Sequence, residues 1–178
     1  MKTWNVAAGL LVAASLLSGC KSYEDQAVTI SQISSPKASS DDWRSVSTTK
    51  HAERFESPLG TIEFSQTPSL LKSIEQPKTA AAFSILRKQI ERDFKASKCS
   101  LMSATDPDQL TINNHDFLHT TYRTRDVQNQ RQRVEIYAAP INNMLVTIIV
   151  RIGDDADIYS YSDLQSFLTE RVRAISKA

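Results

Sequence analysis

The segment MLVTIIVRI, residues 144–152, decides the fold because it is apolar on both sides of an extended chain. Successive side chains of a β-strand point to opposite faces of its sheet. Both faces of this segment hold mostly apolar side chains: Met144, Val146, Ile148 and Val150 on one, and Leu145, Thr147, Ile149 and Arg151 on the other. Such a strand is typical of the centre of a sheet that is covered on both sides. We therefore expect residues 144–152 to form a central strand.

Short polar breaks divide the sequence before this segment into further strands. Strand-like stretches occupy residues 98–103, 110–112, 116–125 and 131–139, with turn-forming residues between them. Connections this short join neighbouring antiparallel strands. Another strand is expected at TIEF, residues 61–64, after a turn that contains Pro58 and Gly60. The pattern predicts an antiparallel sheet.

Two amphipathic helices are expected, one before and one after the strands between residues 98 and 152. Over residues 79–97 the apolar positions recur at spacings of three and four: Ala82, Phe83, Leu86, Ile90 and Phe94. A last helix is expected to begin at Ser162, which forms a capping box with Gln165 and precedes an apolar stripe from Leu164 to Ile175. The predicted fold class is α+β, an antiparallel β-sheet covered by two amphipathic helices, in a globular domain over residues 54–178.

The element order and the closing pattern NNMLVTIIVRI…YSDLQSFLTERVRAI resemble the PsbP-like fold family. This family includes small bacterial lipoproteins of the DcrB-like kind. The resemblance implies an α/β/α sandwich and a role in binding or assembly, and it transfers no catalytic residues.

The first 19 residues are typical of a secretory leader. Lys2 is followed by an apolar run over residues 6–17, which is shorter than the roughly 20 residues that a membrane-spanning helix needs. Leu17, Ser18, Gly19 and Cys20 resemble the lipobox of bacterial lipoproteins at every position. The resemblance implies a diacylglyceryl group on the Cys20 thiol, cleavage before Cys20, and acylation, commonly by palmitate, of the new amino terminus. Because Lys21 and not aspartate follows, it also implies the outer membrane rather than the periplasmic face of the inner membrane.

Residues 20–53 are predicted to be a flexible tether behind the lipid anchor. They are rich in Ser, Thr, Lys, Gln and Asp and hold few large apolar residues. Val28, Ile30, Ile33 and Trp43 are exceptions to this composition. Two alternatives are therefore a short docked strand and a contact with a partner through Trp43.

Composition and motifs favour no catalytic or metal chemistry. The 21 basic and 20 acidic residues nearly balance, which gives no reason to expect nucleic acid as a partner. The chain contains no G-x-S-x-G motif, and His115 and His119 would lie about 13 Å apart along one strand. The acidic run over residues 154–163 lacks the spacing of a calcium loop. We expect no enzyme activity, no metal, and no cofactor beyond the lipid on Cys20.

Four arginines flank the loop DVQNQ, residues 126–130: Arg123, Arg125, Arg131 and Arg133. If the flanking strands pair across this loop, their alternation puts all four on one face. One interpretation is a polar hairpin tip. The other is a docking patch for an acidic protein surface or a phosphorylated lipid headgroup.

The expected function is that of a lipid-anchored outer-membrane lipoprotein with a non-enzymatic, periplasm-facing domain for binding or envelope assembly. An unidentified protein partner is expected in addition to the membrane. The alternative is a periplasmic immunity or inhibitor lipoprotein that neutralises a toxic enzyme, because small size, a nearly neutral charge and a tether fit that class equally well.

Overall fold

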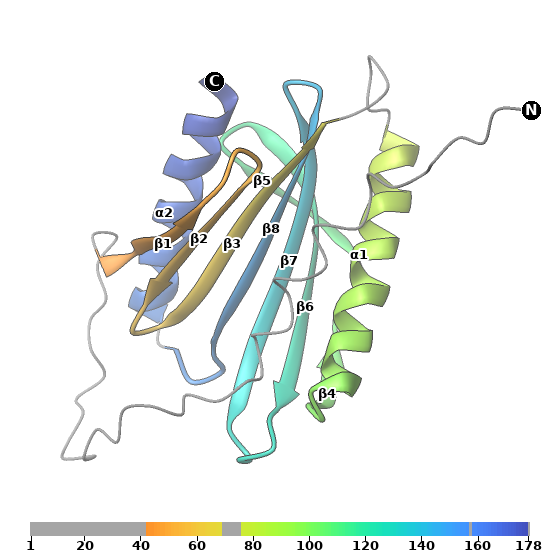
Figure 1. Ribbon diagram of the computed structural model, residues 1–178, viewed down its shortest axis with the longest axis vertical. Helices are drawn as coiled ribbons and strands as arrows, with labels where there is room; N and C mark the ends of the chain where they lie inside the picture. Colours follow the sequence, from red (N-terminus) through yellow and green to blue (C-terminus); the bar gives the residue numbers. More distant parts are fainter. Residues whose placement is uncertain (1–41, 69–75, 157, 178) are drawn as a thin grey trace, which may run out of the picture.

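The computed structural model of the 178-residue chain describes residues 42–68, 76–156 and 158–177 (Figure 1). The predicted signal peptide, the lipobox and Cys20 lie outside the described residues, as does most of the predicted tether. Among the residues described, no helix is both long and apolar enough to cross a bilayer.

Eight antiparallel strands form one sheet, and two helices complete the described fold. The strands are β1 Arg44–Thr48, β2 Ala52–Ser57, β3 Gly60–Pro68, β4 Ser100–Ala104, β5 Asp108–Ile112, β6 His115–Arg125, β7 Arg131–Ile141 and β8 Met144–Gly153. The helices are α1 Gln76–Ala96 and α2 Ile158–Lys177. The strand order is β1-β2-β3-β8-β7-β6-β4, and β5 pairs with the part of β6 that β4 leaves free.

Pairs of asparagines close two of the hairpins. Asn113 and Asn114 join β5 to β6 with φ of 47° and 63°, and Asn142 and Asn143 join β7 to β8 with φ of 50° and 60°. A two-residue turn with positive φ at both positions matches the right-handed twist of the flanking strands, and asparagine tolerates that conformation better than most residues. The Asn142 side chain also donates hydrogen bonds to the carbonyls of Ile175 and Ser176, which ties this turn to the end of α2.

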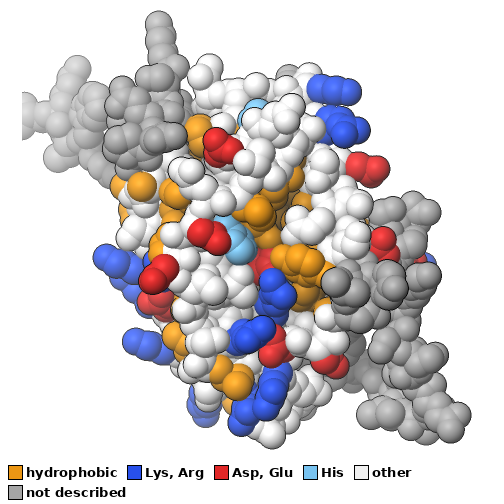
Figure 2. Space-filling view, turned by 180° about the vertical axis from the view of Figure 1, so that it is seen from behind, with side chains coloured by type: hydrophobic (Ala, Val, Ile, Leu, Met, Phe, Trp, Pro, Cys, Tyr) orange, Lys and Arg blue, Asp and Glu red, His pale blue; other side chains and the backbone are white. Residues whose placement is uncertain are grey.

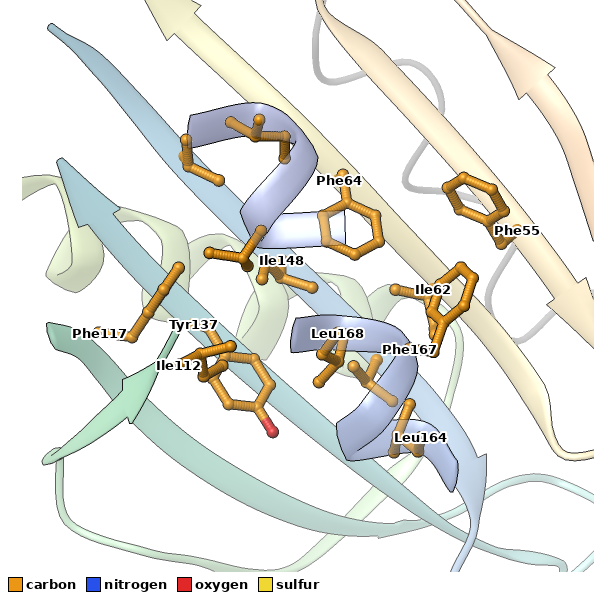
Figure 3. Packing of buried hydrophobic residues seen from close by; sticks show 14 of the residues in the cluster. Phe55, Ile62, Phe64, Ile112, Phe117, Tyr137, Ile148, Leu164, Phe167 and Leu168 are labelled. Carbon is orange, nitrogen blue, oxygen red and sulfur yellow. The ribbon is translucent and has the colours of Figure 1, made fainter. Parts of the chain in front are cut away.

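Strand β8 lies inside the sheet between β3 and β7, as its two apolar faces predict. Its Val146, Ile148 and Val150 belong to a core with α2, while Ile149 belongs to a second core with α1. Figure 3 shows the α2 core, where Leu164, Phe167 and Leu168 of the helix meet apolar side chains from several strands. The α1 core is smaller and contains Phe83, Ile90 and Phe94 of that helix.

The predicted fold class, a sheet covered by two helices in a PsbP-like α/β/α sandwich, is wrong. The eight-stranded sheet dominates the described structure, which holds only two helices. A helix with its side chains is about 10 to 12 Å wide, whereas strands lie about 4.8 Å apart, so a helix aligned with the strands covers only part of an eight-stranded sheet. Helix α1 contacts β4, β6 and β7. Beyond it, β2 and β3 carry Arg54, Glu56 and Glu63, which form ion pairs.

Part of the predicted tether belongs to the sheet. The structure pairs β1 with β2 and buries Trp43, which stacks on Phe167 of α2 with ring centroids 5.6 Å apart. All five side chains of β1 are exposed. Backbone hydrogen bonds and the ring of Trp43 therefore hold β1 in place. Its sequence shows no apolar alternation that would have predicted it.

Candidate functional site

The hairpin of β6 and β7 brings the four predicted arginines together. Arg123 pairs with Arg133, and Arg125 with Arg131, across the two strands. Opposed residues share a face, and alternation puts both pairs on the same side of the sheet. Glu135 and Tyr137 follow Arg133 on this face, which is the face that α2 packs against.

Two of the four arginines are held by carboxylates of the domain itself. The Nε of Arg123 lies 3.0 Å from Oδ1 of Asp154. The Nε of Arg133 lies 2.6 Å from Oε1 of Glu135, and the guanidinium also sits over the ring of Tyr161, 4.7 Å from its centroid. These two side chains therefore contribute to the fold as well as to the surface.

Arg125 and Arg131 are the two arginines of this set that can contact a binding partner. Arg131 is exposed. Arg125 is half-buried, and its buried Nε has no hydrogen-bond partner among the described residues. Both side chains belong to the end of the hairpin where it turns.

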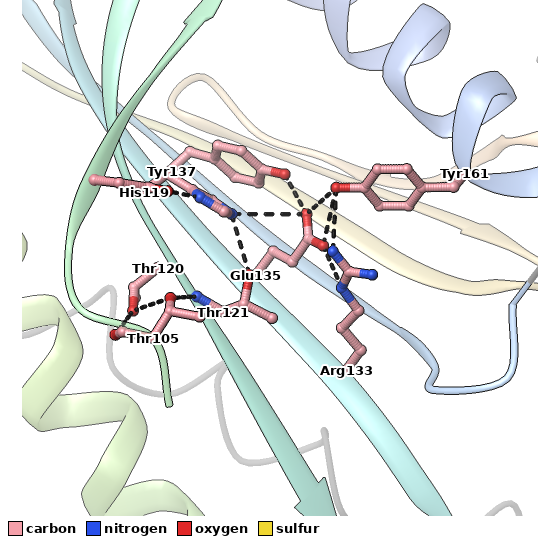
Figure 4. A network of polar contacts seen from close by, with 9 residues as sticks. Thr105, His119, Thr120, Thr121, Arg133, Glu135, Tyr137 and Tyr161 are labelled. Carbon is pink, nitrogen blue, oxygen red and sulfur yellow. Dashed lines mark hydrogen bonds and ion pairs between the residues drawn. The ribbon is translucent and has the colours of Figure 1, made fainter. Parts of the chain in front are cut away.

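A second cluster surrounds Glu135, which has no exposed surface (Figure 4). The hydroxyl of Tyr137 donates a hydrogen bond to one carboxylate oxygen. The hydroxyl of Tyr161, from α2, lies 3.1 Å and 3.3 Å from the two oxygens. With Arg133, these donors compensate the removal of the carboxylate from water.

His119 of β6 lies at the edge of this cluster. Its Nδ1 is 2.9 Å from Oδ1 of Asp108 in β5, and its Nε2 is 4.0 Å from Oε2 of Glu135. The ring packs on Tyr137 with centroids 4.6 Å apart, and 12% of the side chain is exposed. His119 thereby connects the β5–β6 hairpin to the buried carboxylate.

Burial raises the pKa of the two phenols further above neutral pH. Desolvation, and then the charge of Glu135, raise the pKa of Tyr137 and that of Tyr161 above the ordinary tyrosine value. An ordinary tyrosine is protonated at neutral pH, and the raised pKa keeps both hydroxyls protonated, as hydrogen-bond donors, to higher pH. The hydrogen bonds and ion pairs of this cluster connect β5, β6, β7 and α2.

His115 and His119 have different partners in the structure. His115 lies at the start of β6, where its Nε2 is 2.8 Å from the Ser176 hydroxyl of α2. Within the described ranges, no three His, Cys, Asp or Glu side chains are grouped so as to hold a metal ion. The burial of Glu135 was not predicted, although its place within the apolar run of β7 indicated it.

No family model matches the chain, and no curated protein matches it. Among solved structures, a protein from Bacteroides thetaiotaomicron is similar with a TM-score of 0.42 and 9% identity. That match covers 68% of this chain and 39% of the other, so this chain spans well under half the length of that protein. A protein of unknown function from Pseudomonas aeruginosa is similar with a TM-score of 0.35 and 11% identity, over 75% of this chain and 85% of the other. These likenesses are too distant to assign a fold family or a function.

Proposed function

We propose that this chain is a lipid-anchored outer-membrane lipoprotein with a non-enzymatic, periplasm-facing binding or envelope-assembly domain. The anchor is supported by the charged and apolar leader and by the lipobox at Leu17–Cys20. The observation that carries the binding role is the gathering of four arginines on one face of the β6–β7 hairpin. Arg125 and Arg131 are the members of this set available to a partner.

Acylation of Cys20 would account for stable attachment to a membrane. One acyl chain holds a protein only marginally, because each buried methylene contributes about 0.8 kcal/mol, whereas two or three chains make release slow. The test is mass spectrometry of the mature protein together with fractionation of a Cys20→Ser variant. We expect an acylated amino-terminal cysteine in the parent chain and loss of the mature membrane-bound form in the variant. A mature Cys20→Ser protein in the outer membrane, or a disulfide at Cys20, contradicts the anchor.

The binding role is tested by crosslinking in the native host followed by mass spectrometry. We expect a partner that is lost on replacing Arg125 and Arg131 with glutamine. The control replaces Arg173 and Lys177, two exposed cations near the end of α2, in the same way. A partner retained by the first pair of substitutions contradicts the arginine surface. A stoichiometric complex with a toxic enzyme would instead assign the domain to the immunity or inhibitor class.

A further inference from the structure

The end of the sheet where β6 turns into β7 carries exposed apolar side chains. Among the described residues, five large apolar side chains are exposed, and three of them lie here: Leu101 at 49%, Met102 at 45% and Val127 at 67%. The register puts Ser100 of β4 opposite Arg125 and Leu101 opposite Thr124. Val127 lies in the loop just beyond Arg125. The three side chains thus belong to one end of the molecule.

Cations lie at the same end of the sheet as these apolar side chains, although Leu101 shares a face with Thr124 and Arg125 lies on the other face. Arg125 and Arg131 face each other across the hairpin, and the exposed Lys98 lies two residues before β4. The loop also holds Asp126, whose Oδ1 accepts hydrogen bonds from the backbone N–H groups of Gln128 and Gln130 at 2.9 Å and 2.8 Å. Figure 2 shows Lys and Arg side chains gathered on the lower half of the molecule with hydrophobic side chains among them.

We call this surface the hairpin end and define it by Lys98, Leu101, Met102, Arg125, Val127 and Arg131. Three cations stand against two carboxylates, that of Asp126 and that of the exposed Asp155 in the loop after β8, which lies beside Arg131; the surface keeps a small positive charge. Arg123 and Arg133 are not included, because Asp154 and Glu135 pair with them. The surface therefore combines a positive charge with apolar groups that water already contacts.

We infer that the hairpin end binds the surface of an anionic phospholipid membrane. The three apolar side chains enter the boundary between headgroups and acyl chains, and the cations bind the phosphate oxygens. Protein segments with apolar side chains beside Lys and Arg bind membranes in this way, through buried apolar area and attraction to anionic lipids. Guanidinium groups in particular match the geometry of a phosphate.

The size of the surface favours a membrane over an acidic protein. A specific protein interface usually buries about 800 Å² on each partner around a packed apolar centre. Three part-exposed side chains on a loop and an edge strand offer a small, protruding surface instead. Weak attachment suffices for a membrane when an anchor already holds the domain nearby, because tethering raises the effective concentration.

This inference rests on the proposed function, since the acyl chains on Cys20 supply that proximity. Cys20 and Trp43 are 23 positions apart (43 minus 20), and an extended segment of that length spans up to about 80 Å. Strand β7 has 11 residues and is about 37 Å long. The segment is therefore long enough for the hairpin end to reach the membrane that carries the anchor.

The test uses the full mature chain, residues 20–178, with Cys20→Ser so that no acyl chain holds it. The probes are vesicles of phosphatidylcholine alone and vesicles of phosphatidylcholine with phosphatidylglycerol. We expect sedimentation with the anionic vesicles, decreasing as salt rises. Arg125→Gln with Arg131→Gln should lower the partition coefficient about 25-fold, because each basic side chain at an anionic surface contributes a factor of about five. Val127→Ser should lower it about fivefold through lost apolar burial.

The matched controls carry the same changes elsewhere on the domain. Arg173→Gln with Lys177→Gln removes two cations at α2, and Val46→Ser changes an exposed valine of β1; both should bind the anionic vesicles as the parent does. Equal binding to both kinds of vesicle, or an equal loss in the controls, overturns the inference. Binding to polyglutamate and not to anionic vesicles also overturns it, and assigns an acidic protein partner that leaves the proposed function standing. Failure of the proposed anchor is seen separately, in the mass of the mature protein.

Discussion

At the scale of single residues, Glu135 is the side chain whose surroundings are most demanding. It lies between Val134 and Ile136 in the middle of β7 and has no exposed surface. An ionised carboxylate in such a place is costly unless a cation and hydrogen-bond donors surround it. Tyr137, Tyr161 and Arg133 supply them, and each comes from β7 or α2. The position of α2 against the sheet therefore depends on this carboxylate as well as on apolar contacts.

Arg133 and Arg131 provide a matched comparison, because they lie two residues apart on the same face of the same strand. Arg133→Gln removes the cation beside Glu135 and should lower the free energy of unfolding by about 2 kcal/mol, the range for interactions with a buried charged group. Arg131 is exposed, so Arg131→Gln should change the free energy of unfolding by less than about 0.5 kcal/mol. Urea unfolding followed by circular dichroism measures both. Equal effects of the two substitutions would show that the ion pair with Glu135 contributes nothing.

Alkaline pH should destabilise the domain through its buried phenols. Burial raises the pKa of Tyr122, Tyr137 and Tyr161 above the ordinary value of about 10. Above that pH the unfolded chain loses these protons while the folded chain keeps them, so the folded state binds more protons. Stability is then fully present below about pH 10 and falls as pH rises, by up to about 1.4 kcal/mol per pH unit for each tyrosine. Urea unfolding at a series of pH values above and below about 10, with tyrosinate absorbance as a second probe, tests this prediction. A free energy of unfolding that does not change with pH contradicts the burial of the phenols.

At the scale of elements, apolar periodicity predicted the strands and helices that bury at least one face. It missed β1, which other interactions hold in place. The strands β6, β7 and β8 and the helix α1 were predicted within a few residues, because apolar spacing follows from the face that an element buries. Strand β1 has no buried face, so no alternation marked it. Helix α2 begins at Ile158 and not at the Ser162 capping box, and the Ser162 carbonyl accepts a hydrogen bond from Ser166 within the helix.

The cluster around Glu135 could not be predicted in the same way. Its members come from β5, β6, β7 and α2, and no local spacing relates Asp108 or His119 to Tyr161. The arginines were predictable because all four belong to one hairpin, whose turn and alternation fix their common face. Local pairs can be inferred from a sequence, whereas contacts between distant elements need the sheet order.

Trp43 should hold β1 on the sheet, since the strand buries no side chain of its own. Trp43→Ala removes the stacking on Phe167 and should cost about 3 kcal/mol, at the lower end for a large buried aromatic side chain. Amide hydrogen exchange of residues 44–48 should accelerate more than that of β8. Val46→Ala, at an exposed position of the same strand, is the control and should leave both measurements nearly unchanged. Undiminished protection of β1 in the Trp43 variant contradicts this role.

At the scale of the whole molecule, the sheet is wider than its helices can cover, and its two edges remain to be protected. An edge strand offers unpaired backbone groups to another sheet, and bulges are one way in which proteins prevent that association. Strand β1 at one edge, and β4, which shares the other edge with β5, each carry a register shift, between Ser45 and Ser47 and between Leu101 and Ser103. The residues skipped by the pairing are Val46 and Met102, and both are exposed. A bulge in β1 and a bulge in β4 therefore both hinder pairing with another sheet.

Deleting Met102 should turn β4 into a regular edge strand. Leu101 pairs with Thr124 and Ser103 with Arg123, so removal of the residue between them leaves consecutive pairs on both strands. A regular edge without the bulge is a better template for a second sheet. We expect the deletion to increase association with protein concentration, measured by light scattering of the mature chain with Cys20→Ser, relative to the parent. Met102→Ala keeps the chain length and the bulge and should associate no more than the parent. If the deletion variant scatters as the parent does, while its circular dichroism shows an intact fold, the bulge has no protective role and the edges must be protected by other means.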